Sequence, residues 1–104
     1  MFGILHADGS GEDNPSIHGL SDLYDELATS NREHGDVSVI NDDSGWCISA
    51  HRDGRVTFGH LSDPESDLHM RSVAKAKVIA MWKMLIAGDI AGLKREDWSR
   101  GHGS

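Results

Sequence analysis

The chain has 104 residues, and 17 acidic against 10 basic residues give it a formal net charge of −7. The length fits one domain, and the negative field repels phosphate backbones and anionic lipid surfaces, which argues against nucleic acid and membranes as partners. The single cysteine, Cys47, excludes an internal disulfide, and the N-terminal apolar run is too short for a signal peptide, so we expect a cytoplasmic protein.

The N-terminal third is predicted to hold a short strand, a loop and one helix. Residues 2–6 are compatible with an edge strand, whereas residues 7–16 are turn formers and carboxylates that predict a mobile loop. A helix over residues 19–30, capped by Ser21, is expected because four apolar side chains recur at helical spacing: Leu20, Leu23, Tyr24 and Leu27.

The stretch Asp36–Leu61 carries the strongest pattern, a period-two alternation that predicts three antiparallel strands at residues 36–40, 46–51 and 55–59. Glycine-containing turns at residues 41–45 and 52–54 join them. The face expected under the helices carries Val37, Val39, Trp46, Ile48, Val56 and Phe58. The fold class is therefore α+β: a three-stranded meander, or four-stranded with residues 2–6, covered on one face by two helices.

The C-terminal part is predicted to be mainly helical. Residues 61–70 are expected to form turns around Pro64, and an apolar helix follows over residues 73–87, with Ser72 as N-cap and Gly88 as the stop. A further helical turn is expected at Ile90 and Leu93. Trp98 should pack on the core before a flexible tail over residues 99–104.

Histidine is abundant, with seven residues in the chain, but the spacing of these histidines is not that of metal ligands. A site built from His51, His60 and His69 is the alternative hypothesis, a small metal-dependent or acid/base enzyme. The leading expectation is no catalytic residue, no metal and no cofactor. Cys47 is interpreted as a buried thiol that acts as a small hydrophobe.

The succession EHGDVSVINDDSGWCISAHRDGRVTF, then LHM, the helix with MWKMLIAGDI and the closing Trp98 resembles small uncharacterised bacterial proteins. It is also distantly similar to immunity proteins of polymorphic toxin systems. The resemblance implies a small acidic α+β domain that binds and neutralises a protein, and it assigns no functional residue.

These observations favour a non-catalytic binding or inhibitory module that engages a protein partner, with a basic partner favoured by the charge. The acidic loops and the open sheet face supply the expected binding residues: Asp42, Asp43, Trp46, His51, Arg52 and Asp53. A structural homodimer formed through the apolar helix is a third hypothesis. Trp46 decides how much the binding hypothesis gains, because it either stacks on Trp82 in the core or lies on the open face.

Overall fold

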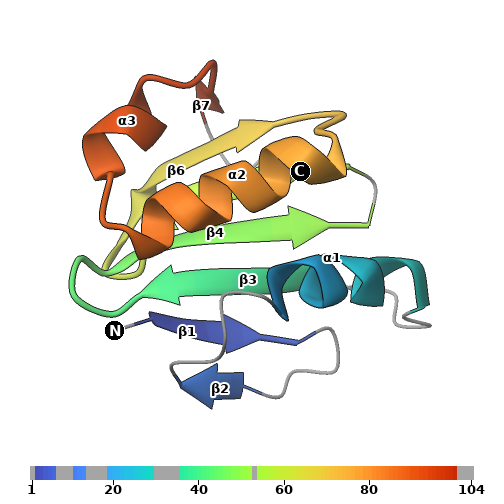
Figure 1. Ribbon diagram of the computed structural model, residues 1–104. Coiled ribbons are helices and arrows are strands. Elements are labelled where there is room, and N and C mark those ends of the chain that lie inside the picture. The colour runs from blue at the N-terminus through green and yellow to red at the C-terminus, as the bar shows by residue number, and fades with distance from the viewer. Residues whose placement is uncertain (1, 7–10, 14–18, 30–35, 53, 101–104) are drawn as a thin grey trace.

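The protein is described by a computed structural model that covers residues 2–6, 11–13, 19–29, 36–52 and 54–100. These residues form one antiparallel sheet of seven strands in the order β2-β1-β3-β4-β5-β6-β7. The strands are β1 Phe2–Leu5, β2 Gly11–Asp13, β3 Asp36–Asn41, β4 Trp46–His51, β5 Val56–His60, β6 Asp63–Met70 and β7 Ser99–Arg100. The helices are α1 Leu20–Thr29, α2 Lys75–Ile86 and α3 Ile90–Lys94. Figure 1 shows α1 and α2 lying across the same face of the sheet, so the α+β class is confirmed.

The three predicted central strands form β3, β4 and β5 in one register. Ile48 in the middle strand is paired with Val39 on one side and with Phe58 on the other. Because side chains alternate along a strand, these three point to the same face, and all three are fully buried there. The predicted buried face is confirmed, except that Trp46 at the start of β4 is only half-buried. Of the predicted edge strand over residues 2–6, Phe2–Leu5 joins the sheet as β1.

Helix α2 lies over β3 and β4 and uses its apolar side chains for the core of its own chain. Val78, Met81, Trp82 and Leu85 are buried in it. The indole Nε1 of Trp82 donates a hydrogen bond of 3.1 Å to the backbone oxygen of Ile48, which fixes the helix on the centre of the sheet. Burial of this apolar face within one chain already explains the composition of α2. The composition is therefore no argument for a homodimer, and the homodimer hypothesis stays a prediction.

Helix α1 packs through the predicted stripe, with Leu20, Leu23 and Leu27 buried. Two polar contacts join its surface to its neighbours, an ion pair with α2 and a hydrogen bond with the residue that follows β1. Lys75 lies 2.7 Å from Asp25, and His6 lies 2.7 Å from Glu26. In the described part of the chain no helix has the length and apolarity needed to cross a bilayer.

A stack of aromatic rings closes the C-terminal side of the core. Phe58 lies between Trp46 and Trp98, with ring centroids 4.7 Å and 5.3 Å away. The indole of Trp98 donates to the oxygen of Leu93 at 2.7 Å, which also fixes α3. Trp98 therefore packs on the core, as predicted, and Gly88 follows the C-cap of α2 with a positive φ of 82°.

Several boundary predictions are wrong. Residues 63–70 form β6 rather than turns, because the apolar residues of its second half pair with β5, as in Phe58 with Leu68. Short edge strands β2 and β7 lie within the segments predicted as mobile loop and tail, and the other residues of those segments lie outside the described residues. Ser21 lies inside α1, which begins at Leu20. Ser72 has a positive φ of 56° in the turn before α2, so the helix begins later, after Ala74.

Candidate functional site

The acidic turn between β3 and β4 is held in one shape by its own side chains. The carboxamide oxygen of Asn41 accepts backbone N–H bonds from Asp43 at 2.9 Å and Ser44 at 3.1 Å. Gly45 completes the turn with φ of 77°, a conformation that favours glycine. The side chains of Asp42 and Asp43 are exposed on this turn, which presents two carboxylates to solvent from an ordered backbone.

The turn between β5 and β6 is joined directly to the acidic turn. The backbone N–H of Leu61 donates to the oxygen of Gly45 at 2.9 Å. Next to it, Nδ1 of His60 accepts the backbone N–H of Ser62 at 3.2 Å, so the imidazole carries its proton on Nε2 when it is neutral. The side chain of Leu61 is 64% exposed, and Asp63 is exposed beside it. The two turns form one surface, which we call the turn surface: Asp42, Asp43, Leu61 and Asp63.

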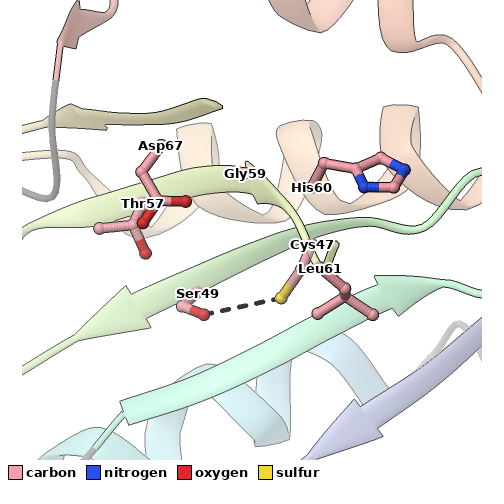
Figure 2. A pocket seen from close by; sticks show the side chains of 7 residues that line it. All are labelled: Cys47, Ser49, Thr57, Gly59, His60, Leu61 and Asp67. Atoms are coloured by element: carbon pink, nitrogen blue, oxygen red, sulfur yellow. Dashed lines mark hydrogen bonds between the residues drawn. The ribbon is translucent and has the colours of Figure 1, made fainter. Parts of the chain in front are cut away.

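A cavity of about 250 Å³ opens beside the turn surface, on the face of the sheet opposite the helices. Its floor comes from two pairs of residues on adjacent strands, Cys47 with Gly59 and Ser49 with Thr57. These alternate with Ile48 and Phe58, whose side chains point into the core, so the floor belongs to the open face. Figure 2 shows the residues that line the cavity: Cys47, Ser49, Thr57, Gly59, His60, Leu61 and Asp67.

The cavity owes its shape to an irregularity between β5 and β6. Phe58 pairs with Leu68 and His60 with Asp63, so Gly59 alone on β5 faces the four residues 64–67 on β6. The extra length makes β6 bulge and places the Asp67 carboxylate over Gly59. A Cβ atom at position 59 would collide with Oδ1 of Asp67. Because Gly59 has no side chain, the Asp67 carboxylate can lie above it and form one border of the cavity.

Cys47 lies at the bottom of this cavity and belongs to a chain of small polar groups. Its Sγ is 3.8 Å from Oγ of Ser49, which lies 2.7 Å from Oγ of Ser38. Burial raises the pKa of the Cys47 thiol, and the hydrogen bonds of Ser49 and Ser38 only partly offset this. The thiol is thus protonated at neutral pH and is a poor nucleophile. It is half-buried on the open face, so the prediction of a buried thiol is corrected.

The five predicted binding residues that the structure describes do not form one patch. Asp42, Asp43 and Trp46 lie at one end of β4, whereas His51 and Arg52 lie at the other, about 17 Å away at about 3.4 Å per residue. Asp53 lies outside the described residues. Successive turns of a meander lie at opposite ends of its strands, so residues that precede and follow β4 are close in sequence but far apart in space.

Trp46 adopts neither of the two arrangements that we considered. It stacks on Phe58 rather than on Trp82, whose ring instead meets the edge of Tyr24 at 6.4 Å. The Nζ of Lys94 lies 4.7 Å from the centroid of the Trp46 ring. Trp46 is therefore a half-buried residue of the helix-covered face and does not belong to the open face.

The three histidines of the alternative hypothesis do not converge on one point, because His51 and His69 flank Thr57 whereas His60 packs against Trp46. His51 hydrogen-bonds to Thr57 at 3.4 Å on the open face, and His69 is paired with the same Thr57 from the other side. His60 meets the edge of Trp46 at 5.4 Å. Within the described ranges there is no group of three or more His, Cys, Asp or Glu residues that could hold a metal ion. The hypothesis of a metal site from these histidines gains no geometric support.

Sequence reasoning missed two residues that define the cavity, Gly59 and Leu61, and it grouped Asp67 with the loop carboxylates of a docking surface without placing it at a cavity. One signal was present, since a glycine inside a strand pattern often marks a bulge or a close approach. The position of Asp67 had no such signal, because it depends on how far β6 bulges.

The fold and the cavity together define an antiparallel α+β domain with one face covered by helices and a carboxylate-bordered cavity on the other. No protein-family model, curated protein or solved structure matches the chain. Function is therefore argued from the geometry of this molecule alone.

Proposed function

We propose that the protein is a non-catalytic binding module that engages and inhibits a basic protein partner, in the manner of an immunity protein. The turn surface is the observation that carries this proposal. It combines an exposed leucine with exposed carboxylates on two turns that are hydrogen-bonded to each other.

Charge and order at this surface both favour protein binding. A net charge of −7 steers a cationic protein towards the molecule and discriminates against acidic ones. Because Asn41 and Gly45 already fix the acidic turn, binding costs little ordering of the backbone. Leu61 supplies apolar area that becomes buried only when a partner covers it.

The immunity-protein resemblance predicts a toxin-like or secreted-effector reading frame beside the gene. The test measures binding of the protein it encodes, by calorimetry at low and moderate salt. We expect the double variant Asp42→Asn/Asp43→Asn and the variant Leu61→Ser each to weaken binding at least about tenfold, or about 1.4 kcal/mol. Affinity for the wild type should also fall with rising salt, because rim charges act through long-range attraction.

The matched control is Asp22→Asn, which removes one exposed carboxylate from the first turn of α1, on the helix-covered side. It should bind as the wild type does. Wild-type affinity in both turn-surface variants, or affinity insensitive to salt, would show that this surface does not form the contact.

A further inference from the structure

The cavity beside the turn surface has the size of a site for one side chain. Its volume of about 250 Å³ lies below the about 300 Å³ at which small-molecule sites begin. It opens on the same side as Leu61, which lines it and is largely exposed. A partner that covers Leu61 would therefore also cover the mouth of the cavity.

The chemistry of the lining is asymmetric. The Asp67 carboxylate borders one side, above Gly59, and the hydroxyl-bearing Ser49 and Thr57 lie on the floor. Leu61 supplies an apolar wall. This arrangement is complementary to a flexible apolar stem that ends in a positive charge, the shape of a lysine or arginine side chain.

We propose that this cavity receives one cationic side chain of the basic partner, with its charged end at the Asp67 carboxylate and its methylene groups along Leu61. The proposal rests on the proposed function and specifies its anchor. An ionised carboxylate has about four lone-pair sites, so Asp67 can accept from an incoming donor in addition to the neighbours it already contacts. A charge-assisted bond of this kind, shielded by Leu61, is stronger than a bond between neutral groups.

The experiment titrates the isotope-labelled protein with the peptide acetyl-Gly-Gly-Arg-Gly-Gly-amide and follows backbone amide shifts by NMR. A second peptide carries lysine, and a third carries citrulline, which has nearly the shape of arginine without its charge. We expect both cationic peptides to shift the amides of Cys47, Gly59 and Asp67 in a saturable way, and the citrulline peptide to bind at least tenfold more weakly.

Two variants and one chemical probe sharpen the result. Asp67→Asn keeps the shape of the side chain and should weaken the arginine peptide at least tenfold, whereas Asp22→Asn should not change it. Cys47, the single cysteine of the chain, should react more slowly with N-ethylmaleimide when the arginine peptide is bound. Gly59→Ala should also lose binding, because its Cβ displaces the Asp67 carboxylate.

The outcomes separate this inference from the proposed function. Shifts confined to Asp42, Asp43 and Asp63 would overturn the cavity as anchor and leave the binding proposal standing. Equal binding of the citrulline peptide, or no saturable shift at Gly59 with either cation, would also overturn it. The proposed function itself fails if the turn-surface variants bind the protein partner as the wild type does, or if the affinity does not depend on salt.

Discussion

The side-chain amide of Asn41 donates a hydrogen bond of 2.8 Å to the backbone oxygen of Leu85, in the last turn of α2. The Leu85 oxygen also accepts the backbone N–H of Gly88 at 3.0 Å, so Asn41 adds a second, buried hydrogen bond at this helix end. The oxygen of the same carboxamide organises the acidic turn. Asn41 thereby couples the position of α2 to the shape of the candidate binding surface.

The variant Asn41→Asp should lower the free energy of unfolding by about 3 kcal/mol at neutral pH. It replaces the donor by a buried negative oxygen that faces the carbonyl of Leu85, and charged groups left unsatisfied cost more than neutral ones. Chemical denaturation measures the loss. Asp42→Asn is the control, since it changes an exposed neighbour and should stay within about 0.5 kcal/mol of the wild type. Stability equal to the wild type in Asn41→Asp would contradict the role given to this bond.

Gly45→Ala should destabilise the protein more than Gly88→Ala, although both glycines have positive φ, 77° and 82°. A left-handed conformation costs about 1–2 kcal/mol for alanine at either position. At Gly45 the added Cβ would also lie 2.7 Å from Nε2 of His60, whereas at Gly88 it meets nothing within 4 Å. We expect about 1 kcal/mol of additional loss at Gly45 for this overpacking, measured by thermal and urea unfolding.

The double variant Gly45→Ala/His60→Ala tests the cause of that difference. Removing the imidazole removes the collision, so the double variant should be more stable than the sum of the single effects predicts. Strict additivity would show that His60 is not what restricts this turn.

The central meander could be predicted from sequence because its signal is local. Val37, Val39, Ile48 and Phe58 alternate with polar residues, and period two fixes both the strand and its buried face. A local pattern of another period, apolar residues at helical spacing, predicted the buried stripe of α1. Strand β6 was missed because carboxylates and a proline occupy its first half, and pairing with β5 overrides those local preferences.

The candidate site was less predictable because it depends on contacts distant in sequence. The acidic turn was foreseen from its composition, and Asp42 and Asp43 are exposed there. The cavity depends on the mismatch between Gly59 and residues 64–67, and on the bond between Leu61 and Gly45. Neither follows from periodicity, since a strand pattern does not state how many residues its partner contributes.

Lys94→Gln should lower the free energy of unfolding by about 0.5–1 kcal/mol, the usual value of an exposed cation–π contact. Its Nζ lies 4.7 Å from the ring centroid of Trp46. Lys83→Gln is the matched control, because it changes another exposed lysine at the end of a helix. Tryptophan emission should shift in Lys94→Gln but not in Lys83→Gln. Equal losses in both variants would indicate a general effect of charge rather than a contact with Trp46.

Cys47 should make the stability of the protein depend on pH in the alkaline range. Burial raises the pKa of its thiol in the folded state, so the folded protein holds this proton more tightly than the unfolded chain does. The resulting stability is fully present below the unfolded pKa of about 8.5 and is lost as pH rises through the folded pKa, by at most about 1.4 kcal/mol per pH unit.

The measurement compares the wild type with Cys47→Ala by urea denaturation from pH 7 to 10. Other groups also titrate in this range, so the informative quantity is the difference in unfolding free energy between the two proteins. That difference should be constant up to about pH 8 and then shift against the wild type, because only the wild type must retain a buried thiol proton. The thiol should also react slowly with a disulfide reagent at pH 8, since reaction requires the thiolate. A pH-independent difference together with rapid reaction would show that the thiol ionises as freely as in the unfolded chain.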